Sequence, residues 1–78
     1  MDFIPGDMVV LLNDARDYFG RVSVPAGIVG TVEDRVIGQL GPIYKVRFLF
    51  SGYTHSQRIL GTDLEHFDDE YSRGADKI

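Results

Sequence analysis

The chain has 78 residues, contains no cysteine and carries a formal net charge of −4. A chain of this length accommodates one small domain, and without cysteine it has neither disulfides nor a cysteine-ligated zinc to stabilise it. Absence of cysteine fits a cytoplasmic protein. The longest apolar run, Met8 to Leu12, is far shorter than the roughly 20 residues that span a bilayer, so we expect no membrane association.

The charge is unevenly distributed along the sequence. Six acidic and six basic residues balance within residues 1–61, whereas residues 62–78 hold six acidic residues against Arg73 and Lys77. We therefore expect a domain over residues 1–67 that is neutral up to Gly61, followed by an acidic, flexible tail over residues 68–78. No basic stripe is present, and this disfavours a nucleic-acid partner, whose phosphates require one.

The first predicted strand covers residues 7–13 and follows the turn Pro5-Gly6-Asp7. Alternation puts Val9 and Leu11 on one face and Met8, Val10 and Leu12 on the other, so both faces are apolar. The second face is either covered by the C-terminal segment or forms a self-association surface.

Residues 13–26 follow no strand or helix period and contain Gly20 and Pro25, which predicts a long, hairpin-like excursion. Tyr18 and Phe19 lie within it beside charged neighbours. The two rings are either contact residues for a partner, or one of them folds back as a lid on the core.

The second predicted strand covers residues 28–37 and contains Gly30. Val29 and Val32 are an odd number of positions apart, so strict alternation would send them to opposite faces. We expect a bulge or bend at Gly30 that turns both valines inward.

The third predicted strand, residues 43–50, supplies most of the core, through Tyr44, Val46, Phe48 and Phe50. Residues 51–56 are expected to form a tight connection, residues 57–60 a short fourth strand, and residues 61–67 a turn followed by a further short strand. Four to five antiparallel strands in so short a chain predict an all-β fold, a small closed barrel without free edges.

The segments PGD-x-V-x-L, VPAGIVGTVED and YKVRF, followed by Gly61 to Leu64, resemble small bacterial SH3-like barrels. The most similar group is that of electron-transport accessory proteins: the photosystem I accessory subunit, the variable chain of ferredoxin-thioredoxin reductase and the β-subunit barrel of nitrile hydratase. The photosystem subunit also has a loop similar to residues 52–56. The resemblance implies a non-catalytic accessory module that docks on a larger protein.

Two other barrel classes were compared. Peptide-binding SH3 domains use an aromatic groove with a tryptophan, and this chain has no tryptophan. KOW-type RNA-binding barrels also centre on a glycine in a strand, which Gly30 resembles, but their basic flanks are replaced by Glu33 and Asp34. RNA binding stays an alternative, with Arg35, Lys45, Arg47 and Arg58 as the expected patch.

No catalytic, metal-binding or cofactor-binding signature is apparent. His55 and His66 are eleven positions apart, unlike a helical metal pair, and no phosphate-loop pattern surrounds Gly27 and Gly30. The leading hypothesis is therefore a non-enzymatic module that binds a protein partner. Its expected contact residues are Tyr18, Phe19 and Leu40 near one groove at one end of the barrel, Tyr53 and His55 at the other end, and Arg58. Either end is a candidate for the binding site. A third hypothesis is a homo-oligomer formed through Met8, Val10 and Leu12.

Overall fold

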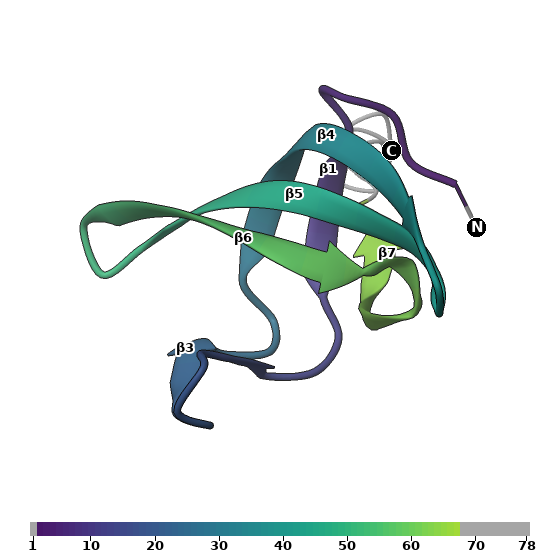
Figure 1. Cartoon of the computed structure of the whole chain (residues 1–78). Coiled ribbons are helices and arrows are strands. Elements are labelled where there is room, and N and C mark those ends of the chain that lie inside the picture. The colour runs from purple at the N-terminus through teal and green to yellow at the C-terminus, as the bar shows by residue number, and fades with distance from the viewer. Residues whose placement is uncertain (1, 68–78) are drawn as a thin grey trace, which may run out of the picture.

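The computed structural model describes residues 2–67, which form an all-β fold (Figure 1). The elements are β1 (Met8–Leu11), β2 (Ala15–Arg16), β3 (Val22–Val24), β4 (Val29–Gly38), β5 (Gly41–Phe50), β6 (Tyr53–Leu60), the 3₁₀ turn η1 (Gly61–Asp63) and β7 (Leu64–His66). The acidic tail predicted for residues 68–78 lies outside the described residues. Within the described part, no helix is long and apolar enough to cross a membrane.

Five strands form one antiparallel sheet in the order β6-β5-β4-β1-β7, and β2 pairs with β3 in a separate two-stranded sheet. The all-β prediction is confirmed at this level. The large sheet curves strongly in Figure 1, but β6 and β7 are not hydrogen-bonded to each other. The expectation of a sheet without free edges is therefore wrong for backbone pairing, because β6 remains an edge strand.

Two long hairpins, β4–β5 and β5–β6, make up most of the large sheet. The β5–β6 turn has only two residues, Ser51 with φ 54° and Gly52 with φ 78°. Positive φ at both positions matches the right-handed twist of the flanking strands, so the ladder begins directly at Phe50 and Tyr53. The predicted connection over residues 51–56 is therefore mostly strand, and β6 is twice as long as the predicted residues 57–60.

Strand β1 lies between β4 and β7 and has the predicted alternation. Val9 and Leu11 are buried, while Met8 and Leu12 are exposed and Val10 is half-buried. Because β1 is paired along both edges, only its outer face is open to solvent.

The prediction of a bend at Gly30 that turns Val29 inward is wrong. The register shift in β4 falls between Val32 and Asp34, three residues later, so Gly30 and Val32 face the core and Val29 faces outward. A Cβ at Gly30 would lie 2.6 Å from Val46 Cγ1 and 2.9 Å from the Arg47 carbonyl oxygen. Gly30 is thus required by the close approach of β5 and not by a bulge.

The core combines predicted and unexpected side chains. Tyr44, Val46 and Phe48 of β5 are fully buried as predicted, whereas Phe50 is only half-buried. The other buried residues are Phe3, Val9, Leu11, Ala15, Val24, Val32, Ile59 and Leu64. Ala15 and Val24 come from β2 and β3, so the excursion contributes to the core through its base.

The N-terminal residues close one side of this core. The Phe3 N–H donates to the Tyr44 hydroxyl at 3.1 Å, and the two rings meet edge to face. The Ile4 N–H donates to Asp7 Oδ2 at 2.9 Å. This bond, helped by His66 Nε2 at 3.4 Å and only partly offset by burial, holds the pKa of the Asp7 carboxyl below its ordinary value.

Candidate interaction surface

The tip of the β2–β3 hairpin, residues 17–21, is organised by one carboxylate. Asp17 Oδ1 accepts hydrogen bonds from the N–H groups of Phe19 and Arg21 at 2.9 and 3.0 Å. The other oxygen of the carboxylate lies 3.3 Å from Arg21 Nε, and Arg16 donates to the Gly20 carbonyl oxygen at 2.8 Å. An Asp that bonds its own following backbone is a common turn former. The hairpin tip therefore has a defined conformation.

This tip holds two aromatic rings in solvent. Tyr18 is 96% exposed and Phe19 is 75% exposed, with their ring centroids 5.5 Å apart in an edge-to-face pair. The Arg21 guanidinium lies over the Phe19 ring, 5.2 Å from its centroid. Neither ring folds back on the core, so the lid alternative is wrong and the rings remain available for contact.

Gln57 of β6 attaches the hairpin to the large sheet. Its Nε2 donates to the Arg16 carbonyl oxygen at 3.1 Å, and its Oε1 accepts a hydrogen bond from the Ser23 hydroxyl. His55 Nε2 lies 3.0 Å from the same Oε1, so that nitrogen carries the proton. Gln57 was not predicted as a site residue. One signal in the sequence could have identified it: Gln57 alternates with His55 and Ile59, so the three residues share the inward-facing side of one strand.

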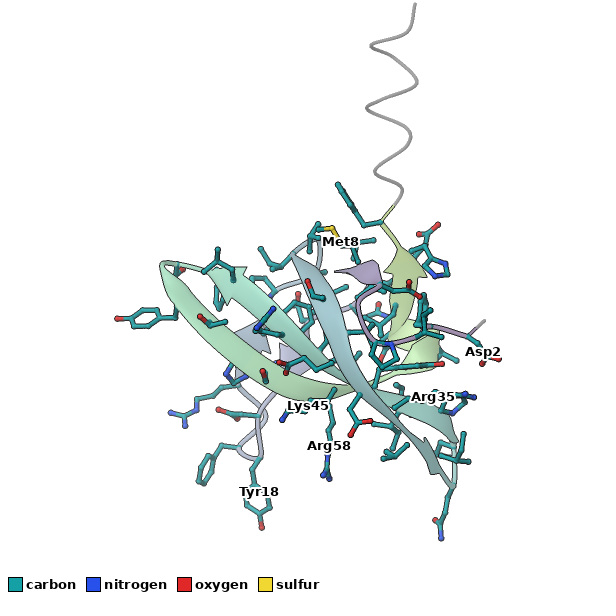
Figure 2. All side chains as sticks on the ribbon, turned by 90° about the horizontal axis from the view of Figure 1, so that it is seen from above. Asp2, Met8, Tyr18, Arg35, Lys45 and Arg58 are labelled. Atoms are coloured by element: carbon teal, nitrogen blue, oxygen red, sulfur yellow. The ribbon has the colours of Figure 1, made fainter. Side chains whose placement is uncertain are left out.

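Positive side chains lie beside the hairpin base. Arg16 and Arg58 line one hollow of about 200 Å³ between the hairpin and β6. Lys45 is the direct cross-strand neighbour of Arg58. Figure 2 shows Arg58 and Tyr18 projecting in the same direction from the molecule, so the predicted Arg58 and the aromatic tip share one side.

Leu40 and Tyr53 lie at other places. Leu40 is at the β4–β5 turn, where it lines a separate hollow with Pro42, Gly61, Thr62 and Leu64. Figure 1 shows this turn well away from β3, so the expectation that Leu40 joins Tyr18 and Phe19 in one groove is wrong. Tyr53, 73% exposed, begins β6 at the opposite end of the β4–β5 hairpin. The six expected contact residues therefore do not form one surface.

Three of the four residues of the RNA-binding alternative lie together, but they are interleaved with carboxylates. Arg35, Lys45 and Arg58 line one small hollow that Asp34 also lines, and Arg35 lies 3.4 Å from Asp2. Arg47 lies 3.9 Å from Glu33. An uninterrupted phosphate-binding patch is not formed.

The outer face of the sheet carries an apolar area next to β1. Met8, Val29 and Leu49 line an open hollow of about 420 Å³ together with Thr31, Arg47 and Thr54. Leu49 is 70% exposed. Met8 belongs to the predicted self-association set. Val29 and Leu49 were not predicted for it, and Val29 was expected to face inward.

Residues 2–67 contain no group of three or more His, Cys, Asp or Glu side chains placed to hold a metal ion. Within the same residues, every buried side-chain nitrogen or oxygen has a hydrogen-bond partner. Comparisons with protein-family models, with curated proteins and with solved structures find no match for the chain.

Proposed function

We propose that the protein is a non-catalytic docking module with an SH3-like barrel arrangement, and that its β2–β3 hairpin binds a larger protein partner. The observation that carries the proposal is the pair of solvent-exposed rings on an ordered turn, Tyr18 at 96% and Phe19 at 75% exposure. Aromatic and arginine side chains are enriched in the energetically dominant parts of protein interfaces.

The fold assignment is supported by the succession of elements. A first strand paired on both edges is followed by a long hairpin excursion, two long hairpins, a 3₁₀ turn and a short last strand next to the first. Such a succession supports an SH3-like barrel arrangement. Binding residues are disproportionately carried by loops that a rigid scaffold positions.

Preorganisation supports the hairpin as the contact element. A flexible loop loses conformational entropy when it binds, and this loss weakens the complex. Here Asp17 fixes the turn, and Gln57 fixes the hairpin base against β6. The two rings are therefore presented in one arrangement before a partner arrives, and most of their area is free to be buried.

The test is quantitative affinity capture by the immobilised full chain from an extract of the organism that encodes it. We expect the double variant Tyr18→Ala, Phe19→Ala to lose at least about tenfold of the captured partner, since interface aromatics often contribute 2 kcal/mol or more. The matched control is Tyr53→Ala, which removes an equally exposed ring at another end of the molecule. Unchanged capture by the double variant would contradict the proposal.

A further inference from the structure

The free edge of β6 is the starting point. Among residues 2–67, β6 pairs only with β5, and no backbone group bonds its other edge. The two-residue turn makes Phe50 and Tyr53 a hydrogen-bonded pair, so alternate residues of β6 direct their N–H and C=O groups away from β5. These residues are Thr54, Ser56, Arg58 and, at the end of the strand, Leu60.

This edge lacks the features that usually protect edge strands. Natural edges are made short, bulged, interrupted by proline or covered with charge. Strand β6 has eight residues, no proline and no register shift against β5, and Arg58 is its only formally charged residue. It is therefore a competent template for another strand.

The two ends of the same edge are complementary in shape. Tyr53 projects at one end and is 73% exposed. Near the other end, Leu11, Ala15 and Ile59 are among the residues that line the hollow of about 200 Å³ between the hairpin base and β6. Polar and charged side chains, among them Asp14, Arg16 and Asp63, line the same hollow. An exposed ring with a polar hydroxyl and an open hollow of mixed polar and apolar lining thus lie along one strand, six residues apart.

We propose that two copies of the chain pair antiparallel through their β6 edges, with the two-fold axis at Ser56. In this register Thr54 of one copy faces Arg58 of the other, so Thr54, Ser56 and Arg58 exchange backbone hydrogen bonds and the two arginines do not oppose each other. Tyr53 then lies opposite Ile59 of the second copy, beside its hollow. The product is a continuous ten-stranded sheet.

This pairing differs from the predicted self-association through Met8, Val10 and Leu12, in which the outer face of β1 would pack on a second copy. Strand β1 has β4 on one edge and β7 on the other, so it offers no free edge for strand pairing. A single added strand pair is a small interface, and small interfaces give weak, concentration-dependent complexes. We therefore expect a monomer–dimer equilibrium, which is independent of the hairpin's docking role.

Sedimentation velocity on the full chain from about 10 μM to 1 mM tests this, because the range spans weak dissociation constants. We expect dimer to appear as concentration rises. Ser56→Pro removes an outward N–H without removing a bond to β5, and should weaken dimerisation at least about tenfold. Tyr53→Ala should weaken it as well. Met8→Lys, on the outer face of β1, is the control and should leave it unchanged.

If Ser56→Pro does not fold, as judged by its thermal transition, Ser56→Lys serves instead, because it places two lysines opposite each other at the axis. A wild-type chain that stays monomeric throughout would overturn the proposal. Dimerisation of a folded Ser56 variant at the wild-type level would also overturn it. Loss of dimerisation in Met8→Lys would do the same, because it would indicate that the two copies associate through the outer face of β1. The docking hypothesis is tested separately by the capture of a partner with Tyr53→Ala. This variant should still capture the partner even if it no longer dimerises.

Discussion

The β2–β3 hairpin and the β5–β6 hairpin both end in turns close to exposed aromatic side chains, but different interactions hold them. The β5–β6 hairpin is held by an uninterrupted backbone ladder from Phe50 and Tyr53 to Ile43 and Leu60. The β2–β3 hairpin has two short strands, a register shift and side-chain hydrogen bonds from Asp17 and Gln57.

We expect this difference to distinguish the supporting sheet from the proposed contact element, the β2–β3 hairpin. A ladder of backbone bonds and buried side chains changes only when the whole sheet is disturbed. A hairpin held by a few side chains can be altered locally, because each bond depends on one residue. Substitutions in the sheet should therefore change global stability, whereas substitutions in the hairpin should change the order of the contact element while the sheet stays folded.

The largest effect is expected for Gly30→Ala in the sheet. The new Cβ would meet Val46 Cγ1 at 2.6 Å and Phe48 Cδ1 at 2.7 Å, so the strands must separate. Overpacking of this kind costs about 1–3 kcal/mol, measurable as a lower free energy of unfolding in urea. Thr31→Ala, the adjacent position on the outer face, is the control and should cost less. Equal stability of Gly30→Ala and wild type would contradict the close packing of β4 against β5.

Gln57→Ala should detach the hairpin from the sheet. The substitution removes the bonds to the Arg16 carbonyl and the Ser23 hydroxyl, and each lost bond is worth about 0.5–1.5 kcal/mol. Hydrogen exchange should become faster in β2 and β3 while β4 and β5 keep their protection. Equally faster exchange in β2, β3, β4 and β5 would show that the β2–β3 hairpin and the large sheet unfold together.

Asp17→Ala should act on the hairpin tip alone. It removes the acceptor for the Phe19 and Arg21 N–H groups, and losses of comparable side-chain caps cost about 0.5–2 kcal/mol. The expected result is faster exchange at residues 17–21 and weaker partner capture, with both rings still present. Asp14→Ala, which removes an acceptor for Ala26 at the hairpin base, is the matched control for the tip. Full capture by Asp17→Ala would refute a role for preorganisation.

The smallest effect is expected for Asp7→Asn, at the N-terminal side of the sheet. The pKa of Asp7 is lower in the folded chain than its ordinary value, chiefly because of the Ile4 N–H. Its carboxylate therefore stabilises the fold above about pH 4, and this contribution is lost as the pH falls further. Urea unfolding should show a slightly less stable variant at neutral pH and a flatter dependence below pH 4. An unchanged acid dependence would contradict this assignment.

Much of the sheet could be predicted from the sequence, because alternation in residues 43–50 and in β1 identifies which side chains are buried. The position of Gly30 could not be interpreted correctly, since a glycine required for a bulge and one required for close packing leave the same pattern. The length of β6 was underestimated because Ser51-Gly52 can close a two-residue turn, and the whole segment of residues 51–56 was assigned to the connection.

The site was predictable only in part. Tyr18 and Phe19 were identified because they are adjacent aromatics flanked by charged residues, in an excursion that follows no strand or helix period. Their exposure was left open, since it depends on the bonds of Asp17. The separation of Leu40 from the hairpin depends on the length and direction of β4, and the role of Gln57 depends on contacts between residues 34 or more positions apart, which a local pattern does not contain.

The most direct test of the docking account is site-specific photo-cross-linking, with p-benzoylphenylalanine in place of Tyr18 in one chain and of Tyr53 in another. Both positions are exposed, and only the first lies on the proposed contact element. The account predicts a discrete cross-link to a larger protein from position 18, weakened by Asp17→Ala, and only self-cross-links from position 53. A cross-link to that larger protein from position 53 and none from position 18 would contradict it.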